Sequence, residues 1–577
     1  MMVDEKKSPA ILKSTGMRGT IHFGDRSSSR WAGWRPRLCV DTLVWGEAVY
    51  MAALLNTAFW RAANAAGAFA GKGSITTAIS LFLIIVALNV LLIRPLCTRW
   101  TTRPILSVFL LVAVFASFFS DRYAVYFDVG MMRNILATDP AESRELLTAA
   151  LLGHVLLYAT LPLILIWGCV LRWPSKPRSL LRMLGSVVLA LVLVVASALL
   201  GFKDVSALMR NHHELRYLVA PSNVLASLAR IAAKDWKSRS DGPRQVIAAD
   251  ARLDGHATMT RPHVLVIVVG ETVRAQNWGL NGYARQTTPQ LAALDVVNYP
   301  DVTACGSSTE VSLPCMFSVH GRSSYDERQI RNSESLLHVL ARTGVKVLWR
   351  DNQGGCKGVC EGLPFESVRQ SQDPELCTAQ GCQDAILLAG LKTRLQAASG
   401  DTVVVLHQLG NHGPSYYLRY PESLRRFRPD CRNADLGECA RGQVVNAYDN
   451  ATLATDDLLA RLISLLDSLQ DRDTALLYVS DHGESLGESN LYLHGLPYAI
   501  APNTQIKVPM VAWVSPSMAR WRGLDMQCVR KQAKRPASHD NLFHSVLGLM
   551  EVSTRAYERS KDVFGICATA PRGESVQ

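Results

Sequence analysis

Four long stretches without a charged residue dominate the N-terminal third of the 577-residue chain. Each holds about 17 or more residues, enough to cross roughly 30 Å of hydrocarbon as a helix. A fifth apolar stretch, Thr42 to Trp60, is interrupted only by Glu47. We expect it to be a span because a carboxyl group near a helix end can reach the interface, although a re-entrant or surface helix is the alternative. The four uninterrupted stretches are Gly73 to Ile93, Pro104 to Ser120, Leu146 to Leu171 and Met183 to Phe202.

Beyond residue 260 the pattern changes to short apolar runs separated by helical patterns. Runs of this length that are rich in β-branched residues are typical of buried strands. Their alternation with helices predicts an α/β domain with a mostly parallel sheet. The predicted strands are His263 to Gly270, Val345 to Arg350, Thr402 to Gln408, Ala475 to Ser480 and Val508 to Val514.

The distribution of charge gives the predicted spans an orientation. The net charge is +12, but residues 1–202 hold 20 basic and 10 acidic residues, so the remainder is nearly neutral. A nearly neutral second part argues against a nucleic-acid-binding domain there. Fifteen of the 20 basic residues fall before the first span and in segments 94–103 and 172–182, all on one side. By the positive-inside rule that side is cytoplasmic, and five crossings place everything after Phe202 outside.

These patterns predict four parts: a cytoplasmic leader (1–41), a five-span transmembrane domain (42–202), a connector (203–260) and an exported α/β domain (261–577). In the connector, apolar residues are interspersed among Arg and Lys from Leu215 to Lys234, which predicts an amphipathic helix. That helix could lie on the membrane surface or face solvent, and the sequence favours neither position.

Ten of the 13 cysteines lie beyond residue 300. Eight of them form couples close in sequence, which suits disulfides in an oxidising compartment. Thiolate zinc sites usually show two CxxC pairs, and the spacings here differ from that pattern. The couples are Cys305 with Cys315, Cys356 with Cys360, Cys377 with Cys382, and Cys431 with Cys439; Cys528 and Cys567 are candidates for a longer bridge.

Polar side chains follow the predicted strands at their carboxyl ends, where the chemistry of open α/β sheets gathers. Carboxylates and imidazoles that converge from several strand ends suit a metal site, for which zinc is the natural choice. Each residue alone would be as well explained by a helix cap or a turn. His407 lies inside the apolar run VVVLHQ and is expected to be a core histidine. The candidates are Glu271, Asp351, Lys357, His412, Asp481, His482 and His494.

A catalytic metal keeps one position open, which a nucleophilic hydroxyl can fill. The segment CGSSTEVSLPCMFS, from Cys305 to Ser318, offers such hydroxyls just before a short predicted helix. A helix start also favours an incoming phosphate, although an ordinary N-cap is the alternative. From composition alone Ser307, Ser308 and Thr309 remain equally eligible.

Several motifs follow one another along the chain: VVGETVR, NGY, CGSSTEVSLPCMFS, WRDN with CKGVC, HQLGNHGP, YDN, SDHGESLGE and YLHG. In this order they resemble the lipid A phosphoethanolamine transferases, the family that includes the colistin-resistance enzymes. The resemblance covers nearly the whole chain. It implies five spans and a periplasmic domain of the alkaline phosphatase and sulfatase superfamily.

The resemblance also implies roles for particular residues. Thr309 matches the family's nucleophile, which the residues alone left open. Its oxygen would complete a zinc site with Glu271, Asp481 and His482. His412 and His494 match substrate contacts, proton donors or ligands of an additional zinc, and Lys357 matches a basic residue near the incoming phosphate. In the loop between the third and fourth spans, residues spaced four apart match donor-lipid contacts and are expected on one helix face, with an ordinary exposed polar face as the alternative: Asn134, Thr138 and Glu142.

The activity implied is transfer of phosphoethanolamine from phosphatidylethanolamine to lipid A through a covalent threonine intermediate. The enzyme would be a monomer of the bacterial inner membrane, with an implied role in polymyxin resistance. Transfer to a core sugar (heptose or Kdo) would use the same catalytic residues. A phosphoglycerol transferase or sulfatase fits the motifs less well. A non-catalytic sensor is disfavoured because the set Glu271, Thr309, Asp481 and His482 is intact.

Overall fold

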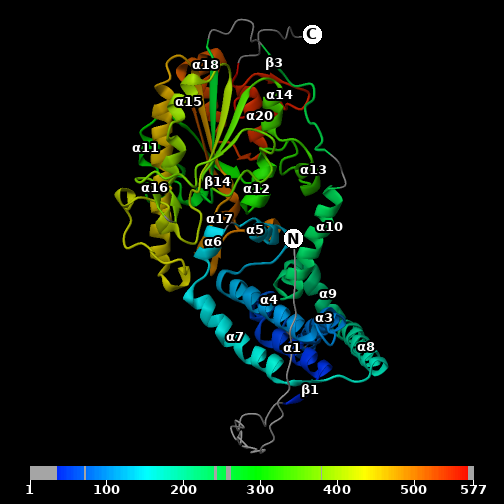
Figure 1. Ribbon diagram of the computed structural model, residues 1–577. Coiled ribbons are helices and arrows are strands. Elements are labelled where there is room, and N and C mark those ends of the chain that lie inside the picture. The colour runs from blue at the N-terminus through cyan, green and yellow to red at the C-terminus, as the bar shows by residue number, and fades with distance from the viewer. Residues whose placement is uncertain are drawn as a thin grey trace, which may run out of the picture.

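The computed structural model of the protein describes residues 36–70, 73–138, 140–239, 243–254, 261–378 and 380–568. Most of the predicted leader therefore lies outside the described residues. Of residues 140–142 and 237–239 only the backbone is described. The molecule has a helical bundle at one end and an α/β domain at the other, with short helices between them (Figure 1).

The bundle contains the predicted apolar stretches as helices. In the described residues, four helical segments are long and apolar enough to cross a membrane, and they coincide with the four uninterrupted stretches. These are α3 (Ser74–Ile93) with its short extension to Leu96, α4 (Thr102–Tyr123), α7 (Ala149–Gly168) and α8 (Lys176–Leu200).

The fifth predicted stretch forms two shorter helices, α1 (Val40–Leu54) and α2 (Thr57–Ala65), which break at Asn56. The break is fixed by Asn56, whose Nδ2 donates to the Ala220 carbonyl and whose Oδ1 accepts from the Ala220 N–H, at 3.0 and 2.8 Å. Before α1, strand β1 (Arg37–Cys39) pairs with β2 (Val170–Arg172), which directly follows α7. Helix α1 therefore runs from the β1–β2 end of the bundle to the connector.

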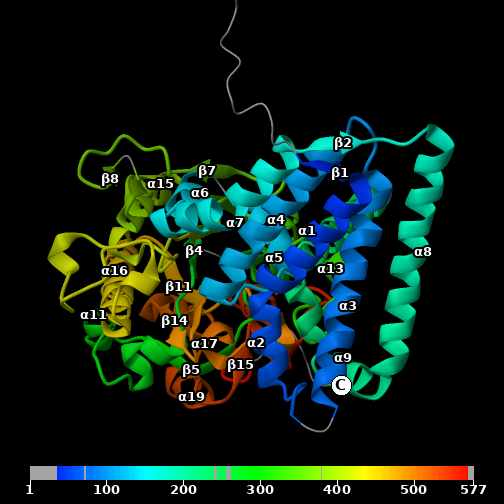
Figure 2. The same ribbon diagram turned by 90° about the horizontal axis from the view of Figure 1, so that it is seen from below.

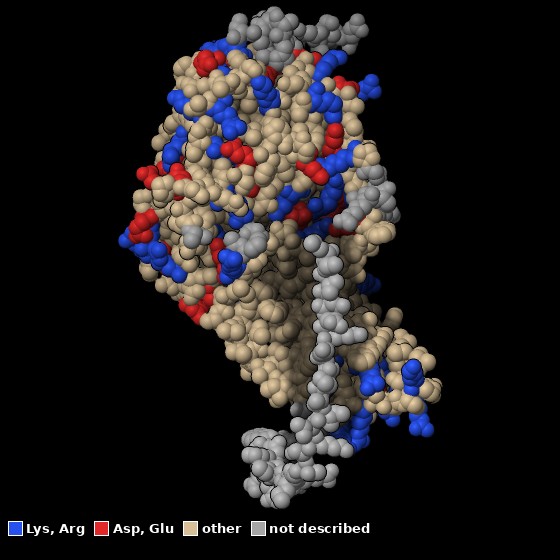
Figure 3. Space-filling view, in the orientation of Figure 1, with Lys and Arg blue, Asp and Glu red and all other residues tan. Residues whose placement is uncertain are grey.

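Two of the helices present apolar faces outward. Residues along α7 and α8 such as Leu157, Leu161, Leu181 and Val188 are more than half exposed. Figure 3 shows the lower part of the molecule almost free of charged side chains over much of its visible face, whereas the upper part carries both signs. An exposed apolar belt of this extent is what a bilayer covers.

Between the bundle and the α/β domain lie the loop helices α5 (Val129–Ala137) and α6 (Pro140–Glu145). The prediction that Asn134, Thr138 and Glu142 share one helix face is wrong. Helix α5 ends at Ala137, Thr138 has extended backbone (φ −67°, ψ 131°), and a new helix begins at Pro140. Proline explains the break, since it disfavours helix in the residue before it and is well tolerated in a helix's first turn.

The first part of the connector is helical, as predicted, and it packs against the loop that holds α5 and α6. Its helices are α9 (Phe202–Asn211) and α10 (Ser222–Arg239), and α10 packs against α5. Figure 2 shows α9 near the lower end of α3 and α8. Further on, β3 (Arg252–Leu253) pairs with β16 (Val552–Ser553) near the C-terminus, so this part of the connector belongs with the α/β domain.

The α/β domain is built on an eight-stranded sheet with the order β15-β5-β14-β11-β4-β10-β6-β7. All five predicted strands lie side by side within it, and β11, β4, β10 and β6 are parallel. Strand β5 was not predicted because its sequence VNYPDVT contains no apolar run; it is antiparallel to β14. The predicted strands are β4 (His263–Gly270), β6 (Lys346–Asp351), β10 (Thr402–His407), β11 (Asp473–Ser480) and β14 (Lys507–Val514).

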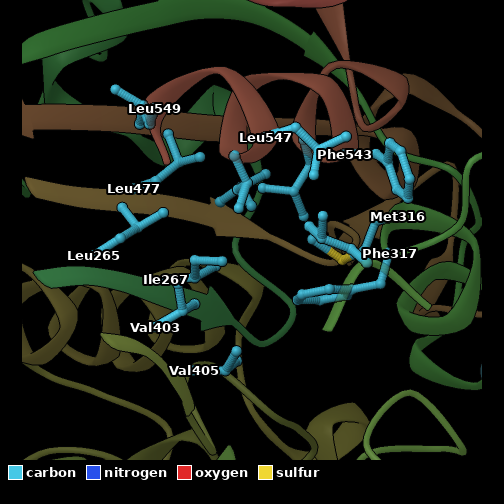
Figure 4. Packing of buried hydrophobic residues seen from close by; sticks show 14 of the residues in the cluster. Leu265, Ile267, Met316, Phe317, Val403, Val405, Leu477, Phe543, Leu547 and Leu549 are labelled. Carbon is cyan, nitrogen blue, oxygen red and sulfur yellow. The ribbon is translucent and has the colours of Figure 1, made fainter. Parts of the chain in front are cut away.

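Helices cover both faces of the sheet. Because successive side chains of a strand point to opposite faces, alternate residues pack against different helical layers. On one face, Leu265 and Ile267 of β4 pack with Phe543 and Leu547 of α20 (Asp540–Leu549), as Figure 4 shows. On the other face, Val264, Val266 and Val268 pack with leucines of the long helix α16 (Arg441–Asp467). With both faces buried, β4 reads as a continuous apolar run rather than an alternating one.

Five disulfides join cysteines of the α/β domain. The four predicted couples are bonded, and so are Cys528 and Cys567, whose pairing the sequence had left open. The remaining cysteines, Cys39, Cys97 and Cys169, are free and lie in the bundle. The Cys305–Cys315 bridge spans α12 (Thr309–Met316), the helix that begins at the candidate nucleophile.

Candidate active site

The carboxyl ends of two neighbouring strands and the start of one helix form the site. Strands β4 and β11 are parallel and in register, with Gly270 opposite Ser480, so the residues that follow them emerge together. Glu271 follows β4, and Asp481 and His482 follow β11. The Asp481 N–H donates to the Gly270 carbonyl at 2.9 Å, which ties the two strand ends.

Thr309 is the first residue of α12 and points its hydroxyl into this cluster. Its Oγ1 donates to Glu271, with the carboxylate oxygens 2.9 and 3.1 Å away, and it lies 3.2 Å from His482 Nε2. The preceding Ser308 has extended backbone and is the N-cap residue of α12. Thr309 is 3% exposed, and Glu271, Asp481 and His482 are fully buried. A substrate can therefore approach the Thr309 hydroxyl only through a narrow opening.

The charges of the site are strongly coupled. Burial, and after it the Glu271 carboxylate, raise the pKa of Asp481 to about 6. Burial alone would lower the pKa of His482, but the Asp481 and Glu271 carboxylates raise it to about 9. Burial would likewise raise the pKa of Glu271, yet the hydrogen bond and charge of His482 hold it well below its ordinary value. Two desolvated carboxylates in contact attract a cation.

The donor set fits a zinc ion. Glu271, Asp481 and His482 offer ligand atoms that lie within 4.8 Å of one another. Asp481 Oδ2 is buried and has no hydrogen-bond partner among the described residues. The His482 Nδ1–H donates to the Gly483 carbonyl at 2.9 Å, which leaves the Nε2 lone pair for a metal. Two carboxylates, one imidazole and a hydroxyl are ligands that zinc accepts in tetrahedral catalytic sites.

The two further candidate histidines lie beside this cluster. The ring of His494 lies 4.3 Å from that of His482, and the ring of His412 lies 5.9 Å from that of His494. Glu484, fully buried, faces His494 Nδ1 at 3.4 Å. An imidazole held at Nδ1 by a carboxylate presents Nε2 outward, which is the arrangement of a proton carrier.

His412 lies on the loop that follows β10, and buried groups hold that loop in place. The Asp384 carboxylate accepts hydrogen bonds from the N–H groups of Leu409 and Gly410, both at 2.8 Å. Arg419 Nε donates to the His412 carbonyl at 2.7 Å. The position of His412 is therefore determined from both sides of the loop.

No hydrogen bond joins Lys357 to Thr309 within the described residues. It is half-buried, has a left-handed backbone (φ 47°) and lines a cavity of about 240 Å³ beside the C-terminal half of α12. Pro314 and Ser318 line the same cavity. The lysine therefore lies along the helix that carries Thr309, and no ion-pair partner is found for it in the described part of the chain.

The residues matched to donor-lipid contacts lie on the loop between bundle and α/β domain. Asn134 is partly buried on α5, and the Thr138 hydroxyl donates to the Asn134 carbonyl at 2.8 Å. Glu142 lies in α6, and its side chain is outside the described residues. The start of α5 packs on α12, with Gly130 close to Val311, so this loop borders the helix that begins at Thr309.

Sequence reasoning missed several residues that hold the site. Glu484, Asp384 and Arg419 act on the histidines, and the end of α6 contributes Glu145, which pairs with Arg419. Only Glu484 had a usable signal, since it lies three residues after Asp481 in the motif SDHGES. The others meet their partners across long separations in sequence, which no local pattern reports.

Two family models match the chain. Residues 85–236 match the model described as phosphoethanolamine transferase EptA/EptB, and residues 263–552 match the sulfatase model. The second match covers all eight strands of the sheet and includes Glu271, Thr309, Asp481 and His482.

Relatives match over most of their length. The chain is 36% identical to phosphoethanolamine transferase EptA of Escherichia coli K12 over 540 residues, 92% of this chain and 98% of that protein. It is 39% identical to phosphatidylethanolamine transferase Mcr-1 of Escherichia coli over 426 residues, 72% and 79% of the two chains.

A solved structure extends the likeness to three dimensions. The integral membrane lipooligosaccharide phosphoethanolamine transferase A (EptA) of Neisseria meningitidis superposes with a TM-score of 0.88 at 35% identity, over 92% of this chain and 100% of that one. The soluble domain of the same enzyme matches 57% of this chain at 43% identity, with a TM-score of 0.56. The family models, the relatives and the fold agree, and the chain belongs to the EptA-type phosphoethanolamine transferases, membrane enzymes with a sulfatase-like domain.

Proposed function

We propose that this enzyme moves phosphoethanolamine from phosphatidylethanolamine to lipid A in two steps, with Thr309 as the covalent carrier. The observation that carries the proposal is the contact of the Thr309 hydroxyl with Glu271 and His482, at 2.9 and 3.2 Å, within a buried cluster. A threonine hydroxyl is a weak nucleophile at neutral pH, so its place among metal-ligating groups is the feature that makes attack feasible.

In the first step the Thr309 oxygen bonds to phosphorus and the bond from phosphorus to the diacylglycerol oxygen breaks. A zinc ion held by Glu271, Asp481, His482 and Thr309 would lower the pKa of the hydroxyl and offset charge on the transferring oxygens. Thr309 loses one proton and diacylglycerol gains one. The neighbouring His412 and His494 are placed to hold and return that proton, with Glu484 orienting His494.

In the second step a phosphate oxygen of a singly protonated lipid A phosphate bonds to phosphorus and the bond to Thr309 breaks. The proton of that phosphate passes to the Thr309 oxygen, which leaves as the free hydroxyl. The first turn of α12 directs backbone N–H groups toward the phosphoryl group, which stabilises its negative charge. Lys357, beside the same helix, supplies a positive charge for the substrate phosphates.

We assign the donor lipid to the loop between bundle and α/β domain, through Asn134, Thr138 and Glu142. The support is position: α5 packs on the nucleophile helix and lies at the end of the bundle from which α10 leads to the α/β domain. A lipid headgroup that enters there reaches Thr309 while its acyl chains stay with the exposed apolar helices.

We further propose that the bundle crosses the inner membrane five times, with the β1–β2 end cytoplasmic and the α/β domain periplasmic. At the β1–β2 end, Asp41 accepts hydrogen bonds from Arg94 Nε at 2.6 Å and from Ser186 at 2.9 Å, so α1, α3 and α8 are tied at one level. That level also holds the basic segments 94–103 and 172–182.

Intact-protein mass spectrometry after incubation with phosphatidylethanolamine tests the carrier. Wild type should gain one phosphoethanolamine, and so should Ser308→Ala, which removes the neighbouring hydroxyl of the same motif. Thr309→Ala should gain none; an adduct that persists in this variant would disprove the assignment.

The acceptor is tested separately. Two relatives, at 26% identity, are Kdo(2)-lipid A phosphoethanolamine 7''-transferases of Salmonella typhimurium and Escherichia coli, so acceptors differ among related proteins. The greater similarity to EptA and Mcr-1 favours a lipid A phosphate. Mass spectrometry of lipid A from cells with and without the gene should show the added phosphoethanolamine on lipid A; its presence on core sugars alone would overturn this choice.

A further inference from the structure

A buried histidine lies between two carboxylates at the edge of the site, and the mechanism above does not use it. Strands β6 and β10 are in register, with Asp351 opposite His407, and β10 is in register with β4, with His407 opposite Val269. Glu271 follows two residues after Val269. Three neighbouring strands therefore bring Asp351, His407 and Glu271 into one row.

The row holds one hydrogen bond and one longer charge contact. His407 Nδ1 lies 2.8 Å from Asp351 Oδ1, and His407 Nε2 lies 3.9 Å from Glu271 Oε2. Asp351 is fixed in turn by the Trp349 Nε1–H at 3.2 Å and by the Gly355 N–H at 2.9 Å. All three members of the row are at most 1% exposed.

The two oxygens of Glu271 have different surroundings. Oε1 accepts from the hydroxyls of Thr272 and Thr309, at 2.8 and 2.9 Å. Oε2 lies 3.1 Å from the same Thr309 hydroxyl and in addition faces His407. His407 Nε2 is buried and has no hydrogen-bond partner among the described residues. An unpartnered ring nitrogen in a dry interior is costly, so its orientation toward Glu271 requires a reason.

We propose that Asp351 and His407 form a positioning pair that sets the orientation of the Glu271 carboxylate for the metal. Asp351 accepts from Nδ1 and so fixes the imidazole ring; Nε2 then faces Oε2 and restricts rotation of the carboxylate. The proposal rests on the proposed zinc site and goes beyond it, since His407 and Asp351 bind neither metal nor substrate. Outer groups of this kind typically change metal affinity about 10- to 100-fold when they are removed.

The same sheet holds a matched control. At the opposite end of β4, His263 is 1% exposed, with Nδ1 3.0 Å from Asp401 and Nε2 3.7 Å from Asp473. This is again an imidazole between two carboxylates, roughly 23 Å of strand away from the site at about 3.3 Å per residue. Loss of His263 should therefore affect stability but not the metal.

The test is zinc affinity, measured by competition with a chromophoric chelator on the full-length protein in detergent, beside its melting temperature. His407→Gln and Asp351→Asn should each bind zinc about 10- to 100-fold more weakly than wild type, whereas His263→Gln should melt lower with unchanged affinity. Asp351→Asn keeps the side-chain volume, but it replaces the carboxylate that holds Nδ1 by a neutral, weaker acceptor and turns an amide NH2 toward the Gly355 N–H. It decides the question if His407→Gln does not fold.

Each outcome has a distinct meaning. Wild-type affinity in a folded His407→Gln or Asp351→Asn protein would overturn the positioning pair while leaving the zinc site intact. An equal loss in His263→Gln would also overturn it, because the effect would then follow from general stability. If wild type itself binds no zinc while Thr309 still forms its adduct, the proposed metal site fails, and this inference with it.

Discussion

Arg419 of the α/β domain donates to both carboxylate oxygens of Glu145, at the end of α6, over 2.9 and 3.1 Å. The guanidinium is nearly buried, and its Nε holds the His412 carbonyl at 2.7 Å. One side chain thus connects the loop of the membrane bundle to a histidine of the active site. The geometry of His412 should therefore depend on how the two parts of the molecule meet.

We expect Arg419→Lys and Glu145→Gln each to lower the turnover number about 10-fold, because a lysine cannot hold both partners and a neutral amide cannot pair with the guanidinium. A double-mutant cycle should give a coupling energy of about 1–2 kcal/mol. Arg428, which pairs with Glu422 on an exposed surface, is the control, and Arg428→Lys should leave turnover unchanged. Additive effects of the two main substitutions would contradict the connection.

The disulfides allow stability and activity to be separated. Chain entropy predicts that loss of the Cys528–Cys567 bridge, with 39 residues of separation, costs about 4 kcal/mol, against about 3 kcal/mol for Cys305–Cys315 with 10. Only the second bridge spans α12 and Thr309. The double Cys→Ala variant of Cys528 and Cys567 should thus lose more unfolding free energy, whereas that of Cys305 and Cys315 should lose more activity. If the two variants lose the same activity when they are compared at equal unfolding free energy, the Cys305–Cys315 bridge has no specific role in catalysis.

Low pH should weaken the contact that His539 makes between Cys305, which precedes α12, and Ser480 at the end of strand β11. His539 accepts from the Cys305 N–H at Nδ1 (3.0 Å) and donates from Nε2 to the Ser480 carbonyl (2.9 Å), which requires the neutral ring. Burial is the main reason that its pKa is lowered to about 4.

A histidine whose folded pKa is lowered contributes its full stability above about pH 6.5 and loses it as the pH falls toward 4. Between pH 7.5 and 5.0 the unfolding free energy should fall by about 2 kcal/mol on account of His539. His539→Gln should be less stable at pH 7.5 but should lack this part of the pH dependence. If the unfolding free energy of His539→Gln falls between these two pH values by as much as that of wild type, the assignment to His539 is wrong.

Removal of zinc should be visible as lost stability. A ligand at 100 times its dissociation constant stabilises the folded state by about 2.7 kcal/mol, so chelation should lower the melting temperature of wild type. Asp481→Ala combined with His482→Ala should melt at the same temperature with and without chelator. A chelator effect that survives in this double variant would place the metal elsewhere.

The sequence predicted the fold well where a single pattern decides the outcome. Continuous apolar runs identified β4, β10 and β11 because both faces of these strands are buried, and uncharged stretches identified α3, α4, α7 and α8. The grouping of Glu271, Asp481 and His482 was also predictable, since these residues follow strand ends directly. The choice of Thr309 over Ser307 and Ser308 needed the family resemblance.

Prediction failed where structure depends on contacts between distant residues. Strand β5 is held by pairing with β14 and β15, not by its own composition. The spacing of Asn134, Thr138 and Glu142 suggested one helix, but Pro140 starts a second one. His407 was rightly expected in the core, yet only the register of three strands reveals that it faces Glu271.

The division of the cysteines has a consequence for how the enzyme is made. The unpaired thiols Cys39, Cys97 and Cys169 lie beside β1, η1 (Arg94–Leu96) and β2, at one end of the bundle, whereas the ten paired cysteines lie in the α/β domain. A chain inserted the wrong way round would keep those ten among cellular reductants and could not close the loop around α12. On the proposed topology, closure of that loop therefore follows export of the α/β domain, and a misoriented copy would lack the bridge beside Thr309.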